Sequence, residues 1–293
     1  FIKKSKKVLL ANKESIICGW HILKKVSEKN KTKIIPIDSE HFSIFELTKN
    51  YQNSDIKKIY ITASGGPFLK KPLRYFKNIK ANDAAKHPKW KMGKKISIDS
   101  SNLMNKVLEL IEAYKFFPFD RKKYEILIHP QSLIHAIVLF NNGQIKFLYH
   151  ETDMKIPIAN AIYDNKINIK TLIKKEGNFL KNLKYLKFEK VDKKKFPIVT
   201  LLKNKTHKNS GSIILNASNE ILVESFIRNK ISFNAIYQCL KQLFKDRDFS
   251  KYAIKKTPNI KEIYKIDKWA RKKTIEIIGK KPWKKLSTNF SYF

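Results

Sequence analysis

The sequence predicts an α/β protein, with an α+β domain built on a mixed sheet followed by a C-terminal bundle of α-helices. Three observations support this fold class. Short apolar runs alternate with helical patterns early in the chain, a hairpin signal at Asn141-Asn142-Gly143 joins two strand-like runs, and the pattern beyond residue 196 is helical. With 293 residues, the chain is long enough for about two domains.

The first elements form a strand–turn–helix unit. Residues 7–11 predict a strand, and a helical pattern opens at Asn12 and continues through Val26. The next strand-like runs, 33–37 and 56–62, each end at a polar segment. Open α/β sheets place their functional residues at such carboxyl ends of strands.

The middle of the chain changes character. Residues 63–95 are rich in loop-forming residues, with one short helix expected near Asn82 to Lys86, and so long a connection is often an active-site lid. Ser100 is expected to be the N-cap of a helix that runs to about Phe116. Later elements are expected as strands at 126–129, 133–140 and 144–150, and as helices at 212–228, 234–244 and 260–278.

The composition is strongly basic, with 62 basic against 25 acidic residues and a formal net charge of +37. Nucleic-acid binding is the obvious interpretation. However, only five of the basic residues are arginines, and the lysines are spread along the whole chain. Drift towards lysine under AT-rich codon usage therefore explains the charge better. Two cysteines with no metal-ligand spacing fit a reducing compartment, and no apolar run approaches the ~18 residues of a membrane span.

Two acidic residues follow the 33–37 run. On extended backbone, Asp38 and Glu40 would lie on one face and could meet one cation, with Glu109 as a third ligand. Three carboxylates suit Mg²⁺ or Mn²⁺ rather than zinc. The alternative is an ordinary pair of solvated acids.

Polar residues also gather near the start of the predicted helix. Asn105 and Lys106 are four and three residues before Glu109, so these side chains can be neighbours. Ser100 would lie beside the helix amides and could form a phosphate-binding site with them. The alternative is a capped amphipathic helix with an ordinary Lys–Glu pair. Trp90 and Met92 in the loop region either cover a ligand or pack locally.

Together these patterns resemble the 1-deoxy-D-xylulose 5-phosphate reductoisomerase family over about residues 6–279. The resemblance is carried by Leu10-Ala11-Asn12-Lys13-Glu14-Ser15, Pro36-Ile37-Asp38-Ser39-Glu40-His41, Ser64-Gly65-Gly66-Pro67-Phe68, His87-Pro88-Lys89-Trp90-Lys91-Met92-Gly93, Asp99-Ser100, Met104-Asn105-Lys106, Glu109, His129-Pro130-Gln131-Ser132, Asp153-Met154 and Leu215-Asn216-Ala217-Ser218-Asn219-Glu220.

The resemblance implies a role for each of these site residues. The metal ligands are Asp38, Glu40 and Glu109, which with His87 form the catalytic group; the substrate contacts are Lys13, Ser39, Glu40, Ser64, His87, Ser100, Asn105, Lys106 and Glu109; the NADPH contacts are Asn12, Glu14 and Gly93; and the lid residues are Trp90 and Met92.

The implied activity is the NADPH- and metal-dependent rearrangement and reduction of 1-deoxy-D-xylulose 5-phosphate to 2-C-methyl-D-erythritol 4-phosphate, in non-mevalonate isoprenoid biosynthesis. The resemblance also implies a homodimer, with residues 126–150 as a candidate interface, and no specific nucleic-acid or membrane partner. A bacterial cytoplasm is expected, with a plastid-like organelle as the alternative. A lysine-rich nucleic-acid-binding protein and an inactive relative remain competing hypotheses.

The N-terminus leads us to expect a fragment of a longer chain. Residue 1 is Phe, and no G-x-G-x-x-G run precedes residue 12. The expected divisions are the C-terminal end of an NADPH-binding domain (1–33), a catalytic domain (34–163) with a lid (64–94), a linker (164–195), a helical domain (196–280) and a tail (281–293).

Overall fold

The computed structural model describes residues 1–90, 92–173, 179–203, 209–280 and 283. The chain forms two compact units, each assembled from separate stretches of sequence. Unit 1 contains residues 1–16, 20–65 and 109–191, and unit 2 contains residues 17–19, 66–108 and 192–293. Within the expected lid, linker, helical domain and tail, the residues that lie outside the described part are 91, 174–178, 204–208, 281–282 and 284–293.

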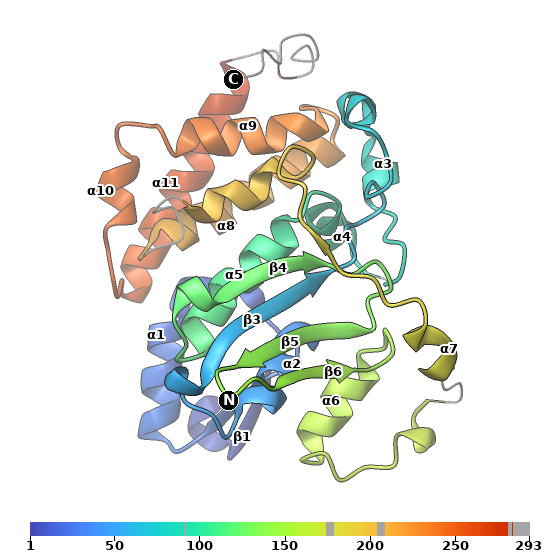
Figure 1. Cartoon of the computed structure of the whole chain (residues 1–293). Coiled ribbons are helices and arrows are strands. Elements are labelled where there is room, and N and C mark those ends of the chain that lie inside the picture. Colours follow the sequence, from blue (N-terminus) through green and yellow to red (C-terminus); the bar gives the residue numbers. More distant parts are fainter. Residues whose placement is uncertain (91, 174–178, 204–208, 281–282, 284–293) are drawn as a thin grey trace. The chain divides into compact units, whose positions relative to one another are not determined.

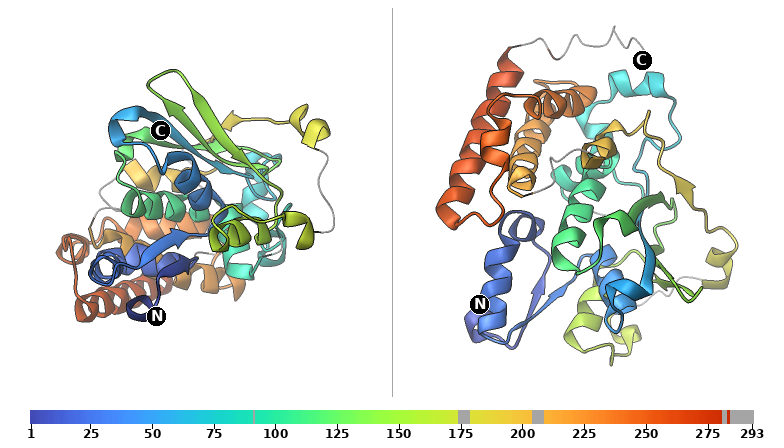
Figure 2. Two further views of the ribbon diagram at one scale, coloured as in Figure 1. Left: turned by 90° about the horizontal axis from the view of Figure 1, so that it is seen from below. Right: turned by 60° about the vertical axis from the view of Figure 1, so that its left-hand side comes forward.

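Unit 1 begins with the predicted strand–helix–strand unit. Strands β1 (Lys7–Leu10) and β2 (Lys33–Pro36) pair in parallel, and α1 (Lys13–Lys29) connects them (Figure 2). Asn12 caps α1, because its side-chain oxygen accepts a hydrogen bond from the Ser15 amide at 2.8 Å. Parallel pairing brings the carboxyl ends of both strands to the same edge.

A five-stranded mixed sheet is the centre of unit 1. Its order is β6-β5-β3-β4-β7, with β3 parallel to β4 and antiparallel to β5 (Figure 1). The predicted hairpin is confirmed, since β5 and β6 pair in antiparallel fashion. The strands are β3 (Ile56–Ala63), β4 (Tyr124–Ile128), β5 (Ile134–Phe140), β6 (Ile145–Tyr149) and β7 (Glu189–Lys190).

Two features of this unit go beyond the sequence expectation. Strand β7 lies in the expected linker and pairs with β4, so that segment contributes to the sheet. Helix α2 (Ser39–Thr48) packs against β5, and α6 (Lys155–Ile162) packs against β1. A small core of Ile35, Phe42 and Ala161 joins β2, α2 and α6.

Unit 2 is built around three helices that match the predicted ones, α8 (Gly211–Ile227), α9 (Phe233–Leu243) and α11 (Ile260–Gly279). They pack on one another (Figure 1). Helix α8 is buried along most of its length, and most of its residues are apolar or small. The other α-helices among the described residues are α3 (Ala81–Ala84), α4 (Lys94–Ser101), α5 (Met104–Phe116), α7 (Phe179–Leu183) and α10 (Phe249–Ala253).

Membrane-spanning segments were sought among the helices of the described residues. None of these helices combines the length and the apolar character that crossing a membrane requires.

Candidate functional site

Three carboxylates meet in unit 1. Asp38 and Glu40 lie at the junction of β2 and α2, and Glu109 lies on α5. One oxygen from each of the three carboxylates lies within 4.8 Å of the other two. The structure therefore brings together all three of the predicted metal ligands.

The local reason for this grouping differs from the predicted one. Asp38 is the N-cap residue of α2, and Glu40 lies in the first turn of that helix, so the expected extended backbone through Glu40 is wrong. An Asp at the N-cap followed by Glu in the first turn is a favourable helix start, because both negative charges lie at the positive, N-terminal end of the helix dipole. The neighbouring Ser39 donates a hydrogen bond to Glu40 Oε2 at 2.7 Å.

A lysine lies among these carboxylates. Lys13, in the first turn of α1, donates a hydrogen bond to Asp38, and its Nζ lies 3.5 Å from Glu109 Oε1 and 3.3 Å from Glu112 Oε2. Burial disfavours the ammonium, but the attraction of Asp38, Glu112 and Glu109 outweighs burial and raises the pKa of Lys13 well above its usual value. The site therefore favours positive charge.

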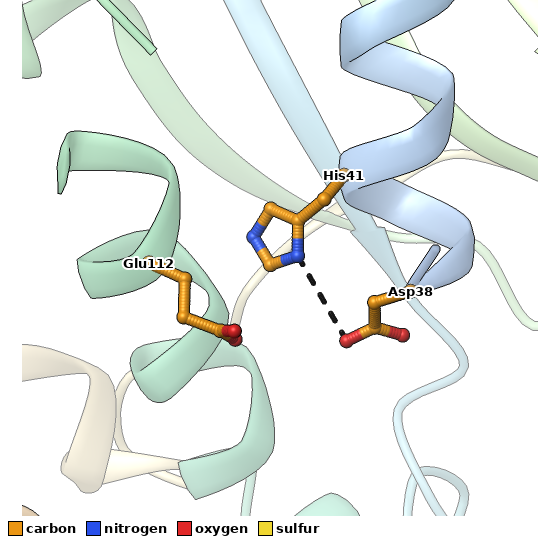
Figure 3. A group of neighbouring side chains, drawn as sticks. All are labelled: Asp38, His41 and Glu112. Atoms are coloured by element: carbon orange, nitrogen blue, oxygen red, sulfur yellow. Dashed lines mark ion pairs between the residues drawn. The ribbon is translucent and has the colours of Figure 1, made fainter. Parts of the chain in front are cut away.

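Sequence reasoning did not single out two members of the site, His41 and Glu112. Figure 3 shows both side chains near Asp38, with His41 Nδ1 3.8 Å from the Asp38 carboxylate. His41 Nε2 lies 2.9 Å from the Glu109 backbone oxygen, which ties α2 to α5. Each follows a predicted ligand by three residues on a helix, and that spacing was the available signal.

Burial shapes the acidity of this group. It raises the pKa of Glu112 to about 7, although Lys13 and His41 lower it. Burial also opposes the charge of Asp38, but Lys13 outweighs burial and the pKa of Asp38 falls below its usual value. Asp38 and Lys13 are therefore held as an ion pair.

The donor set fits a hard divalent cation. Carboxylate oxygens of Asp38, Glu40 and Glu109 lie close together, and Lys13 pairs with two of these residues, Asp38 and Glu109. Oxygen ligands of this kind suit Mg²⁺ and Mn²⁺.

The predicted phosphate-binding side chains of unit 2 lie around the turn between α4 and α5. Ser100 belongs to the last turn of α4, where its Oγ donates to the Ile96 carbonyl at 2.9 Å, so the prediction that Ser100 caps a helix is wrong. A separate helix, α5, begins at Met104 and carries Asn105 and Lys106 in its first turn. The two helices separate because Leu103 adopts a left-handed conformation, with φ of 68°.

The other predicted residues take the following places. In unit 1, Asn12 donates to Glu14 Oε2 at 3.0 Å, and Ser64 directly follows β3. In unit 2, His87 Nδ1 accepts hydrogen bonds from the backbone amides of Lys89 and Trp90, at 3.2 and 2.8 Å. These bonds close a turn, Trp90 and Met92 are half-buried, and Gly93 is the N-cap residue of α4.

Three buried histidines lie in or directly after strands of unit 1. His135 and His150 are buried and stack, with ring centroids 3.9 Å apart. His129 Nδ1 lies 2.9 Å from the Lys187 backbone oxygen. Backbone contacts and ring stacking position these three rings.

Two family models match this chain. The model described as the 1-deoxy-D-xylulose 5-phosphate reductoisomerase C-terminal domain matches residues 34–117, and the model described as the DXP reductoisomerase C-terminal domain matches residues 150–273. The first match contains Asp38, Glu40 and Glu109.

Curated relatives and solved structures that are similar to this chain carry the name of the same family. The chain is 47% identical to the 1-deoxy-D-xylulose 5-phosphate reductoisomerase of Pelagibacter ubique over 91% of its own length and 68% of the relative's. It is 38% identical to the enzyme of that name from the Wolbachia pipientis of Culex pipiens, over 94% and 69% of the two lengths.

The chain is also similar to a crystal structure of DOX-P reductoisomerase in complex with NADPH, fosmidomycin and magnesium. The TM-score is 0.87 and the identity 34%, over 95% of this chain and 71% of the other. The Zymomonas mobilis enzyme in complex with NADPH gives a TM-score of 0.82 and 32% identity, over 94% and 70%.

Proposed function

This chain belongs to the 1-deoxy-D-xylulose 5-phosphate reductoisomerase family, and from that premise we propose that Asp38, Glu40 and Glu109 hold the divalent cation of the family's reaction. The reaction converts 1-deoxy-D-xylulose 5-phosphate to 2-C-methyl-D-erythritol 4-phosphate with NADPH, as part of non-mevalonate isoprenoid biosynthesis. The meeting of these carboxylates from α2 and α5 is the observation that carries the proposal.

The cation would supply Lewis acidity to the substrate oxygens during the rearrangement. The chain's own residues prepare that site. Lys13 neutralises part of the carboxylate charge and would donate to substrate oxygens, and Ser39 orients Glu40 through its hydroxyl. His41 holds the backbone of Glu109, so two of the ligand-bearing elements stay in register.

We propose that Ser64, Ser100, Asn105 and Lys106 bind the substrate phosphate. The first turn of α5 supports this assignment, since the helix dipole favours an anion near a helix N-terminus. The phosphate would supply binding energy remote from the reacting carbons. His87 would close over the substrate, with Trp90 and Met92 excluding water from it.

NADPH would contact Asn12, Glu14 and Gly93 according to the same family resemblance. Support comes from the two similar structures that are complexes with NADPH. For the metal, Mn²⁺ is proposed beside Mg²⁺, because the all-oxygen donor set accepts either.

We further propose that the protein is a homodimer that uses strand β6. This strand is one edge of its sheet, and two of its side chains, Ile145 and Phe147, are 61% and 47% exposed. An exposed apolar edge strand is a ready surface for pairing with another chain. A bacterial cytoplasm is the proposed location, supported by the bacterial sources of the relatives; immunolabelling of cells or organelles would distinguish it from a plastid-like organelle.

The proposed function is tested by calorimetric titration of the chain with 1-deoxy-D-xylulose 5-phosphate, with and without Mn²⁺. The Glu109→Gln variant should weaken Mn²⁺ binding at least about tenfold, because it removes one charged oxygen ligand. Glu28→Gln, which removes an exposed acid on α1, is the matched control. Metal-independent binding of the substrate, or equal Mn²⁺ affinity in both variants, would sink the proposal.

A further inference from the structure

A buried polar contact connects two helices of unit 2. Asn219 on α8 donates a hydrogen bond from Nδ2 to Asp99 Oδ1 on α4 at 2.8 Å. The second carboxylate oxygen of Asp99 lies 3.2 Å from Lys95 Nζ. Asp99 is 1% exposed and Asn219 is 0% exposed, so the contact is closed to water.

The residue after Asp99 is Ser100, one of the proposed phosphate-binding residues. Gly66 packs closely against the backbone of Ser100, because a Cβ at Gly66 would come within 2.9 Å of the Ser100 backbone oxygen. The Ser100 oxygen also accepts a hydrogen bond from the Leu103 amide, at the left-handed residue that separates α4 from α5. The turn that carries Ser100 towards Asn105 and Lys106 is therefore fixed on several sides.

Stabilisation of the fold does not by itself explain the contact between Asp99 and Asn219. The hydroxyls of Ser97 and Ser218, and the Asn219 Oδ1 atom, are buried with no hydrogen-bond partner among the described residues. A buried polar atom left without a partner costs free energy, and well-packed apolar side chains would stabilise two helices better. What the Asp99–Asn219 pair adds is direction, because a hydrogen bond between two short side chains fixes the rotation of α4 about its axis.

We propose that Asp99 and Asn219 are positioning residues for the phosphate site: their hydrogen bond sets the rotation and depth of α4, and so places Ser100 opposite the first turn of α5. The inference rests on the proposed function, since it assigns these residues to the binding of the same substrate. Neither residue touches the substrate in this assignment; both act through Ser100.

The test compares two ligands, 1-deoxy-D-xylulose 5-phosphate and 1-deoxy-D-xylulose, which lacks the phosphate. Calorimetry on the full chain with Mn²⁺ gives both dissociation constants. The constant for 1-deoxy-D-xylulose divided by that for its 5-phosphate is the ratio that measures how much the phosphate strengthens binding. We expect Asp99→Ala and Asn219→Asp each to reduce that ratio at least about tenfold, while the affinity for the unphosphorylated sugar stays unchanged. Ser97→Ala, which removes a nearby hydroxyl from the same helix, should leave the ratio as it is.

An exchange of the two side chains provides the rescue. In the double variant Asp99→Asn with Asn219→Asp, the amide and carboxylate change places and the hydrogen bond can re-form, so the ratio should return to within about threefold of wild type. If Asp99→Ala does not fold, the comparison of Asn219→Asp with the exchanged pair carries the test.

Different results would contradict the positioning role and the phosphate site. An unchanged ratio in Asn219→Asp, an equal loss of affinity for both sugars, or a loss that the exchange does not rescue would each overturn the positioning role. A wild-type chain that binds both sugars equally would instead overturn the proposed phosphate site, and the inference with it.

Discussion

The ammonium of Lys13 is hydrogen-bonded to the carboxylate of Asp38, although the two residues are separated by 25 positions. The parallel register of β1 and β2 explains the contact, because Leu10 lies opposite Pro36 and each strand ends a few residues before its charged residue. Two strand–helix junctions thus meet at one edge, and the cation and the carboxylate are delivered by different junctions.

Replacing Lys13 by Met should strengthen metal binding and weaken the metal-free fold. The variant leaves Asp38, Glu109 and Glu112 without their ammonium, so we expect the free energy of unfolding to fall by about 3–5 kcal/mol in EDTA. Mn²⁺ should bind about tenfold more tightly, because it no longer competes with the Lys13 ammonium for the carboxylates.

Urea denaturation in EDTA and in saturating Mn²⁺ measures both effects. The control is Lys24→Met, which removes an exposed lysine that pairs with Glu28 on α1 and should change stability by less than about 0.5 kcal/mol. An unchanged Mn²⁺ affinity in Lys13→Met would show that the ammonium and the metal do not share these carboxylates.

Replacing Glu112 by Gln should change how stability depends on pH. Burial raises the pKa of Glu112 from about 4.5 to about 7, so the folded state keeps its proton after the unfolded chain has lost it. The stabilisation is complete below pH 4.5 and is lost as the pH rises to about 7. Since Gln does not titrate, the stability of the variant relative to wild type should increase by about 3 kcal/mol across that window.

Denaturation curves of both proteins in EDTA, taken from pH 4 to pH 8, give this difference directly. Glu28→Gln serves as the control for removal of an exposed carboxylate. A difference between Glu112→Gln and wild type that is flat across the window would contradict a buried, protonated Glu112.

Replacing Gly66 by Ala should disturb the phosphate site through packing. A Cβ at this position would lie 2.9 Å from the Ser100 oxygen and from Ser101 Cα, and its φ of +67° is unfavourable for alanine. Gly143→Ala is a matched control, because Gly143 has a φ of +85° but open space around it. Both should lose about 1–2 kcal/mol of stability from the backbone, and Gly66→Ala about 1–3 kcal/mol more from the clash.

The affinity for the phosphorylated substrate distinguishes the two glycine variants further. It should fall in Gly66→Ala and stay at the wild-type value in Gly143→Ala. Equal behaviour of the two would mean that the loop before Phe68 does not need its close approach to Ser100.

Replacing Phe147 by Lys should convert the proposed dimer to a monomer. The side chain is exposed on the edge strand β6, where a charge would have to be desolvated on pairing. Sedimentation velocity measures the change, with Ile275→Lys on α11, another exposed apolar position, as the control. A wild-type chain that sediments as a monomer would rule out the interface at once.

Local pattern predicted most elements well. The helices around residues 212–228 and 260–278 and the 141–143 hairpin were visible because their periodicity and turn residues act over a few positions. Strand β7 was not, since Glu189 and Lys190 are two charged residues that carry no strand pattern and pair only because β4 offers an edge. The position of Ser100 was also missed, because the left-handed Leu103 that divides the two helices is a bulky residue with no turn signal.

By itself, the sequence determined the order and type of most of the elements, and through family resemblance the three carboxylates Asp38, Glu40 and Glu109. Only the tertiary structure decided that Lys13, His41 and Glu112 join them, because that grouping depends on the parallel register of β1 and β2 and on the contact of α2 with α5. Such contacts join residues that are far apart along the chain, and local periodicity carries no information about them.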